Sequence, residues 1–260
     1  EYLEAARSRG LKAGLYFSLI DWRHPDFPHC GDAYHPMRDN PDYGNEGRDF
    51  NRYLEYLHNQ VRELCTSYGK LDILWFDFSY DKLRGEAWKA TELINMVRSL
   101  QPEVIIDNRL EVSGEGFGSL ASCKPAPFHG DFVSPEQIIP PEGLRDAEGR
   151  PLIWESCVTM NNHWGYCATD RFYKPASMLI RKLVECVSKG GNLLLNVGPD
   201  ARGRFPQESQ SILQEIGAWM DRNGASVYGC GPAGIDKPEY GRMTTAISMR
   251  TASARCPCMA

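Results

Sequence analysis

The side chains able to do chemistry in this sequence are mainly carboxylates and aromatic rings. It contains no GxSxG nucleophile motif, no phosphate-binding loop and no HExxH zinc motif. A pair of carboxylates can hydrolyse glycosides, because one attacks the sugar or activates water while the other protonates the leaving oxygen. Aromatic rings can stack on the apolar faces of sugars, and several lie near the expected strand ends: Trp22, Trp75, Trp154, Trp164 and Tyr166. These residue types suggest a carbohydrate site.

Asp77 closes the stretch that organises the chain, residues 71–77 (LDILWFD). The unbroken apolar run from Ile73 to Phe76 is typical of a strand buried on both faces of a parallel sheet. In an α/β barrel, the residue at the carboxyl tip of a strand points into the mouth of the active site. Asp77 is therefore a candidate catalytic residue, and capping of the following turn is the alternative.

Strands and helices are expected to alternate along the chain. Helices are predicted at residues 1–9, 46–67, 85–100, 171–188 and 207–223, and strands at 11–19, 71–77, 104–108, 152–155 and 192–197. Such alternation predicts a parallel sheet with right-handed crossovers. Polar residues follow the strands at one end, and no GxGxxG motif follows the first strand. We therefore favour a partial (β/α)8-like TIM barrel with its N-terminal strands missing over an open doubly wound sheet.

The barrel is expected to cover residues 1–228. Residues 229–260 would form a linker or the start of a C-terminal β-sandwich, and residues 249–260 lack any strand or helix period and could be an artefact. A chain of 260 residues suits a barrel of roughly 250. Because residue 1 falls inside an expected helix, we expect the sequence to be a piece of a longer protein.

Composition narrows the partners and the compartment. A net charge of −5 without a basic run argues against nucleic acid, and no apolar stretch is long enough to span a membrane. The nine cysteines form no CxxC pair, so zinc-site spacing is absent. Their odd number favours reduced thiols and the cytoplasm, although a signal peptide could precede residue 1.

An ordered set of motifs resembles the α-L-fucosidases of glycoside hydrolase family 29. The motifs are GLKAGLYFSLIDW (10–22), LDILWFD (71–77), DNR (107–109), GDFVSPEQ (130–137), WESCVTMNNHWGY (154–166) and GGNLLLNVGPDARGRFP (190–206). The resemblance implies a retaining mechanism through a covalent fucosyl-enzyme intermediate. It implies Asp77 as the nucleophile and Glu136 as the acid/base. No metal or cofactor is implied, because the carboxylate pair is sufficient.

The acid/base has rivals. Glu155 is expected to close a strand after a Trp, so it could be the acid or could orient neighbouring groups. Glu111 and Glu115 are weaker rivals on a loop. Without the resemblance, Glu136 itself would be taken for a solvated loop carboxylate.

The resemblance also implies sugar contacts. Arg109 would bind the sugar and keep Asp77 ionised, with a structural ion pair as the alternative. Trp164 would form a wall of the fucose pocket, with plain core packing as the alternative. Trp22, His24 and Tyr34 lie in the long loop after the first expected strand, where the family also supplies contacts.

The expected activity is that of an exo-acting retaining α-L-fucosidase that removes terminal α-L-fucose from glycans or glycoconjugates. A non-catalytic fucose-binding barrel, and a retaining barrel glycosidase acting on a related sugar, remain open. Family members carry a His-rich strand end that this sequence lacks. We therefore expect that residues 1–260 alone neither fold stably nor hydrolyse substrate.

Overall fold

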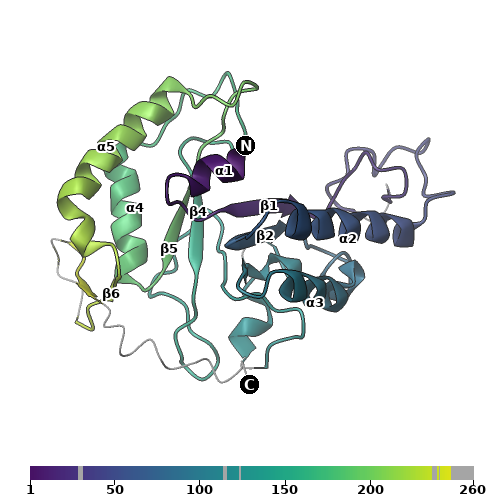
Figure 1. Cartoon of the computed structure of the whole chain (residues 1–260), viewed down its shortest axis with the longest axis horizontal. Helices are drawn as coiled ribbons and strands as arrows, with labels where there is room; N and C mark the ends of the chain where they lie inside the picture. The colour runs from purple at the N-terminus through teal and green to yellow at the C-terminus, as the bar shows by residue number, and fades with distance from the viewer. Residues whose placement is uncertain (29–31, 114–115, 123, 236–238, 240, 247–260) are drawn as a thin grey trace. The chain divides into compact units, whose positions relative to one another are not determined.

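The computed structural model describes residues 1–28, 32–113, 116–122, 124–235, 239 and 241–246 (Figure 1). These residues belong to two compact units. Unit 1 contains residues Glu1–Ser134 and Asp146–Leu152, and unit 2 contains residues Pro135–Arg145 and Ile153–Ala260. Within the described part of the chain, no helix is both long enough and apolar enough to cross a membrane.

Unit 1 is built on a parallel sheet in the order β1-β2-β3. Its elements are α1 (Tyr2–Arg7), β1 (Gly14–Ser18), α2 (Phe50–Ser67), β2 (Ile73–Asp77), α3 (Ala90–Leu100) and β3 (Ile105–Ile106), with short 3-10 turns at Gly85–Trp88, Asn108–Leu110 and Gly118–Ser122. The register pairs Ser18 with Asp77, so the carboxyl ends of β1 and β2 lie level.

Helix α2 covers this sheet with an apolar stripe. Asp49 caps its start, where the side chain accepts a hydrogen bond from Asn51 N at 2.9 Å. Leu54, Leu57 and Val61 recur at helical spacing and are buried in the core of the unit. These residues share one buried core with Leu74 and Phe76 of β2.

Two carboxylates, the buried Asp107 and the half-buried Asp131, hold the edge beside β3. Asp107 Oδ1 accepts a hydrogen bond from Phe76 N at 2.9 Å, and Asp131 Oδ2 accepts one from Ile106 N at 2.8 Å. The chain then runs alongside β3, because Asp107 forms an isolated parallel bridge with Phe132. These contacts satisfy backbone groups that would otherwise be buried without partners.

Unit 2 pairs two parallel strands and packs two long helices. It contains β4 (Glu155–Thr159), α4 (Ala176–Ser188), β5 (Asn192–Asn196), α5 (Gln207–Asn223), a 3-10 turn at Gly224–Ser226, and an antiparallel pair formed by β6 (Cys230–Pro232) and β7 (Thr244–Ala246). Leu179 of α4 and Ile212 of α5 share a buried cluster with Met160, which follows β4.

The predicted alternation of helices with parallel strands is confirmed, but one strand was misplaced. The strand expected at residues 152–155 begins at Glu155 and runs to Thr159. The apolar letters of Leu152, Ile153 and Trp154 suggested a strand, yet Ile153 is 67% exposed and Trp154 packs on the backbone of Gly191. The domain boundary at residue 228 stays a prediction, and the tail at 249–260 lies outside the described residues.

Candidate active site

Asp77 ends β2 with both carboxylate oxygens engaged. Its Oδ1 accepts a hydrogen bond from Arg109 Nη1 at 3.0 Å, and its Oδ2 accepts one from Tyr16 OH at 3.0 Å. The Asp77 side chain is 15% exposed and that of Arg109 is 2% exposed. A charge-assisted pair at this depth fixes the orientation of the carboxylate.

Arg109 is held on several sides. It lies in the 3-10 turn after β3, its Nη2 donates to Ser134 O at 3.1 Å, and its guanidinium carbon lies 4.4 Å from the centre of the Trp75 ring. Hydrogen bonds from Nη1 and Nη2 and the ring at its face offset part of the cost of burying the guanidinium charge. The structure therefore brings Arg109 to Asp77 as the sequence predicted.

Tyr16 is a candidate site residue that the sequence reasoning missed. It lies on β1 beside Trp75, and the two rings stack at 5.6 Å with an angle of 25°. The register places Tyr16 on the same sheet face as Trp75 and Asp77, because side chains alternate along a strand. Aligning the carboxyl ends of β1 and β2 would have placed Tyr16 beside Trp75 and close to Asp77.

Each candidate carboxylate is followed by a residue in the left-handed backbone region. Phe78 has φ 75° after Asp77, and Gln137 has φ 59° after Glu136. Residues other than glycine rarely adopt such angles, and where they do, the strain is often found at functional sites. Ser79 helps to hold the first of these turns, since its Oγ donates to Leu110 O at 2.9 Å.

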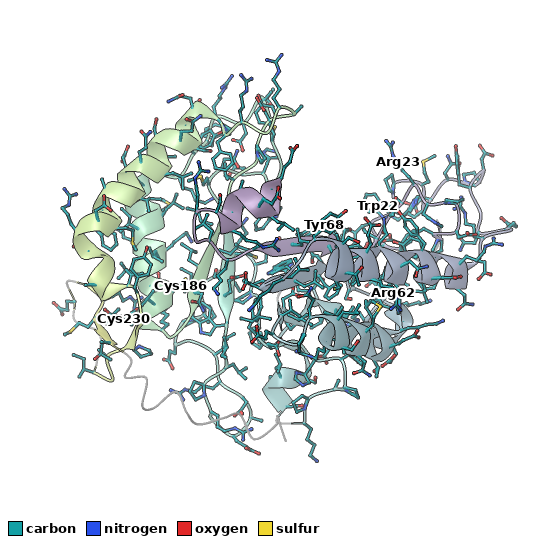
Figure 2. The ribbon with its side chains drawn as sticks, in the orientation of Figure 1. Trp22, Arg23, Arg62, Tyr68, Cys186 and Cys230 are labelled. Atoms are coloured by element: carbon teal, nitrogen blue, oxygen red, sulfur yellow. The ribbon has the colours of Figure 1, made fainter. Side chains whose placement is uncertain are left out.

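The loop after β1 is organised by a buried carboxylate, Asp32. It accepts hydrogen bonds from Trp22 Nε1 at 2.7 Å, Tyr34 N at 2.9 Å and Tyr80 OH at 2.7 Å. Burial and the hydrogen bond to Asp32 raise the pKa of the Tyr80 hydroxyl. Trp22, labelled in Figure 2, is thereby brought together with Tyr34 and with the loop that follows Asp77.

His24 belongs to a different cluster in the same loop. Its ring lies 4.4 Å from Tyr56 and 5.2 Å from Tyr53 of α2, and its Nδ1 accepts a hydrogen bond from Asp26 N at 3.1 Å. These contacts pack His24 against the helix. The structure places it in unit 1 with Trp22 and Tyr34 but gives it separate partners.

In unit 2, Glu136 is held by strand-like pairing with β4. It forms an isolated parallel bridge with Cys157, since Gln137 N donates to Cys157 O at 2.9 Å and Cys157 N donates to Pro135 O at 3.2 Å. The Gln137 side chain donates in turn to Thr159 Oγ1 at 3.1 Å. Glu136 is half-buried on this anchored segment, so the alternative of a freely solvated loop carboxylate is not supported.

Glu155 lies at the opposite end of β4 from the place the sequence predicted. It is the first residue of the strand and pairs with Asn192, the first residue of β5. The expectation that Glu155 closes a strand is wrong, because the apolar run before it was taken for the strand itself. Glu155 therefore does not lie at the carboxyl ends of the strands, which is where the rival acid was expected.

Trp164 lies in the loop after β4 and is 40% exposed, which is not the burial of a core residue. Beside it, His163 Nδ1 lies 2.7 Å from Asp170 Oδ2, and this hydrogen bond, with one from Phe172 N, lowers the pKa of Asp170 to about 2. The same contact raises the pKa of His163. The loop that presents Trp164 is thus pinned by a charge-assisted hydrogen bond.

Comparison with known proteins places these arrangements in a family. The family model described as Alpha-L-fucosidase matches residues 1–225. The chain belongs to the α-L-fucosidase family. A curated α-L-fucosidase of Dictyostelium discoideum is 31% identical over 239 residues, which is 89% of this chain and 45% of that protein. The chain thus spans about half the length of the curated relatives it matches.

Solved structures of fucosidases share the fold. An α-L-fucosidase isoenzyme of Paenibacillus thiaminolyticus is 56% identical, with a TM-score of 0.90 over 95% of this chain and 57% of its own. A family 29 fucosidase of Bacteroides thetaiotaomicron, trapped as a covalent intermediate with 2-fluoro-fucosyl fluoride, is 28% identical, with a TM-score of 0.74 over 94% of this chain and 54% of its own. These likenesses confirm the α/β class of (β/α)8 type predicted from the sequence.

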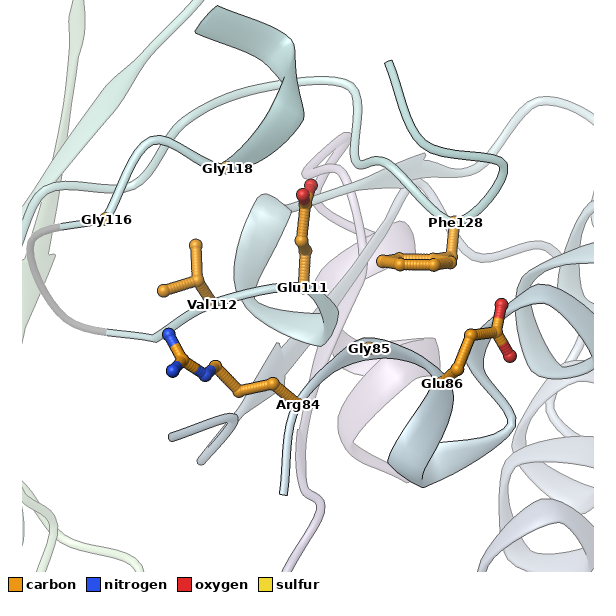
Figure 3. Close-up of a pocket in the computed structure, with 8 residues that line it drawn as sticks. All are labelled: Arg84, Gly85, Glu86, Glu111, Val112, Gly116, Gly118 and Phe128. Atoms are coloured by element: carbon orange, nitrogen blue, oxygen red, sulfur yellow. The ribbon is translucent and has the colours of Figure 1, made fainter. Parts of the chain in front are cut away.

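Glu111 and Glu115 are the remaining rivals of Glu136 for the role of the acid/base. Glu111 lines a cavity of about 520 Å³ in unit 1, together with Arg84, Glu86 and Phe128 (Figure 3). Its two oxygens accept hydrogen bonds from Ser119 N at 2.8 Å and Ser119 Oγ at 2.9 Å. Asp77 and Arg109 do not line this cavity. Glu111 therefore has the contacts of a loop-holding residue, and Glu115 lies outside the described residues.

Among the residues that the structure describes, no group of three or more His, Cys, Asp or Glu side chains is placed to hold a metal ion. Of the cysteines in that part, Cys65, Cys157 and Cys186 are buried, whereas Cys167 and Cys230 are half-exposed.

Proposed function

We propose that the whole protein is a retaining exo-α-L-fucosidase that removes terminal α-L-fucose from fucosylated glycans or glycoconjugates. The observation that carries the proposal is the Asp77 carboxylate at the carboxyl end of a buried parallel strand. It is oriented by Arg109 and Tyr16, in a chain of the fucosidase family. An oriented, ionised carboxylate is what a glycosidase nucleophile requires.

The proposed reaction has two steps. Asp77 attacks the anomeric carbon and forms the fucosyl-enzyme ester, while Glu136 gives its proton to the leaving oxygen. Glu136 then takes a proton from water, whose oxygen attacks the same carbon and releases Asp77 as a carboxylate. Each step inverts the anomeric carbon, so the released fucose has the same anomeric configuration as the substrate. Neither step changes an oxidation state.

The remaining predicted residues would bind the sugar. Arg109 is expected to contact a fucose hydroxyl besides holding Asp77, and Trp164 is expected to stack on an apolar face of the ring. Trp22 and Tyr34, joined through Asp32, would form a further aromatic wall. His24 packs on α2 and Glu155 is the first residue of β4, so their proposed contacts with the sugar come from the family resemblance alone. Nucleic acid and membranes are not expected partners.

The nucleophile is tested with Asp77→Ala in the whole protein. We expect turnover of an aryl fucoside to fall by several orders of magnitude, because the covalent step is lost. Azide should restore part of the activity and give a fucosyl azide of inverted configuration. Near-wild-type turnover by the variant would refute the assignment, and no turnover by the unaltered protein would favour a fucose-binding barrel.

The acid/base is tested by comparing Glu136→Ala with Glu155→Ala. Removal of the acid should harm natural fucosides most and spare substrates whose leaving group needs no proton, such as fucosyl fluoride. We expect this selective loss for Glu136→Ala only. The same pattern for Glu155→Ala, with equal losses on all substrates for Glu136→Ala, would reverse the assignment.

A further inference from the structure

Lys174 lies on the segment that connects β4 to α4, two elements labelled in Figure 1, and its ammonium group is fully engaged. The Nζ atom donates to Thr159 O at 2.8 Å, to Asn161 O at 2.8 Å and to Thr159 Oγ1 at 3.2 Å. An ammonium group has three protons, so these three acceptors use all of them. Lys174 is therefore placed to hold protein atoms, and it has no proton left for a bound anion or a sugar hydroxyl.

The Lys174 cation is held in place although burial opposes its charge. Lys174 is half-buried in unit 2, and burial, followed by repulsion from Lys182, lowers the pKa of its ammonium group. Two of its acceptors are backbone carbonyl oxygens, one on the last residue of β4 and one just beyond the strand. A half-buried cation that donates to backbone carbonyls in this way stabilises one conformation of the turn that follows β4.

The hydroxyl of Thr159 links Lys174 to Gln137. Thr159 ends β4 and is 2% exposed. A hydroxyl has one proton and two lone pairs. The proton goes to Asn161 O at 2.5 Å, and the lone pairs accept from Lys174 Nζ at 3.2 Å and from Gln137 Nε2 at 3.1 Å. Because an ammonium group can only donate, Lys174 keeps the hydroxyl in the orientation that accepts the Gln137 amide.

Gln137 needs this support because its backbone is strained. Its φ of 59° lies in the left-handed region, which residues other than glycine rarely adopt. Such a conformation persists where the surrounding contacts over-determine it. Both polar atoms of the Gln137 side chain meet Thr159, since Thr159 N also donates to Oε1 at 3.4 Å. Pro135 and Gln137 are both bonded to the backbone of Cys157, so Glu136 lies between two anchored residues.

We propose that Lys174 is a positioning residue for Glu136 and acts through Thr159 and Gln137. The inference rests on the proposed function, because it concerns the acid/base of that reaction. Lys174 takes no part in the proton transfer itself, since its protons are given to Thr159 and Asn161. It keeps the strained turn at Gln137 in the conformation that presents the Glu136 carboxyl group. A misplacement of about 1 Å can cost a catalytic group about a hundredfold in rate.

The test uses Lys174→Met in the whole protein, which removes the ammonium group and keeps an apolar stem. The measurement is the ratio of kcat/KM for phenyl fucoside, whose leaving oxygen needs a proton, to kcat/KM for fucosyl fluoride, whose leaving group needs none. Partial unfolding of the variant lowers both constants equally, so it cancels in the ratio. We expect the ratio to fall about tenfold, because a displaced Glu136 protonates the leaving oxygen less well.

Lys182→Met is the matched control, since Lys182 lies on α4 and its charge acts on Lys174. The control should keep the ratio of the unaltered protein, and an equal fall in both variants would assign the effect to lost charge and overturn the proposal. In a Glu136→Ala background, Lys174→Met should lower the ratio no further, because the group that it positions is gone. A further tenfold fall in that background would show that Lys174 acts independently of Glu136 and would also overturn the proposal.

Thr159→Val is the second variant, for the case in which Lys174→Met does not fold. It removes the hydroxyl that joins Lys174 to Gln137 and keeps the shape of the side chain. We expect its ratio to fall in the same direction. An unchanged ratio in either variant, in a protein that cleaves both substrates, would refute the role of Lys174 and leave the proposed function standing. Cleavage of neither substrate by the unaltered protein would refute the proposed function and this role with it.

Discussion

Asp77 and its two donors form the smallest group of residues with a chemical task. Arg109 is almost fully buried and supplies charge, whereas Tyr16 is 56% exposed and supplies only a hydrogen bond. The two donors reach different oxygens of the carboxylate. A carboxylate held at both oxygens keeps a fixed orientation, which is worth more to catalysis than to stability.

Tyr16→Phe separates orientation from stability. Loss of one hydrogen bond to Asp77 should lower kcat for fucoside hydrolysis about tenfold, consistent with about 1–1.5 kcal/mol for such a bond. The thermal midpoint should change little, because the ring still stacks on Trp75. Tyr68→Phe is the control, since its hydroxyl donates to Glu63 on the surface of α2. An equal fall in kcat in both variants would contradict the role of Tyr16.

The His163–Asp170 pair should make the stability of the folded state depend on pH. In the folded state the pKa of His163 is raised and that of Asp170 is lowered to about 2. The stabilisation from His163 is therefore full below its unfolded value, about 6.5, and is lost as the pH rises through the folded value. The stabilisation from Asp170 is present above about 3.9 and is lost as the pH falls toward 2.

This prediction is checked by an NMR titration of His163. In Asp170→Asn the imidazole should titrate at a lower pH than in the unaltered protein, because the charged acceptor is gone. An identical titration midpoint in the two proteins would show that the hydrogen bond does not operate in solution.

Among the helices and strands, those that follow a clear local pattern of apolar residues were predictable from the sequence. The strand that ends on Asp77 was predictable because its apolar run is unbroken, and the stripe of α2 was predictable from its spacing. The first residue of β4 was not predictable. The apolar run before Glu155 resembled a strand more closely than the mostly polar residues of β4 did. The pairing of Glu136 with Cys157 was not predictable either, since it depends on where β4 begins. Tyr16 required the register between two strands.

The extended piece before Glu136 depends on one close backbone approach. A Cβ at Gly130 would lie 2.1 Å from Asp107 O, so this glycine allows the chain to lie beside β3. Gly130→Ala should therefore lower the free energy of unfolding by about 1–3 kcal/mol or more, because backbone atoms must move.

The control is Gly217→Ala in α5, where nothing lies within 4 Å of the added methyl group. That variant should stabilise the protein by up to about 1 kcal/mol through helix propensity. Urea unfolding of the two variants, each made in the whole protein, checks both signs. Equal stability of the two variants would mean that the approach of Gly130 to Asp107 is not needed.

At the scale of the whole molecule, apolar strand residues stand exposed in both units. Ile105 of β3 is 47% exposed and Leu194 of β5 is 40% exposed. Exposed apolar strand faces favour association or an incomplete fold. We therefore expect residues 1–260 expressed alone to bind an apolar dye and to lack a cooperative thermal transition. A cooperative melt together with fucosidase activity would contradict this expectation.

The two candidate carboxylates lie in different units, Asp77 in unit 1 and Glu136 in unit 2. The proposed reaction requires both in one catalytic cycle, so it depends on both units. This chain covers 57% of the Paenibacillus thiaminolyticus structure and 54% of the Bacteroides thetaiotaomicron structure.

The central claim is that Asp77 becomes covalently bound to fucose, and trapping measures it directly. The whole protein is incubated with 2-fluoro-fucosyl fluoride, digested with a protease and analysed by mass spectrometry. We expect one fluorofucosyl group on the peptide that contains Asp77, and none in Asp77→Asn. A stable label on another carboxylate in the unaltered protein, or turnover of the reagent with inversion and no label, would contradict it.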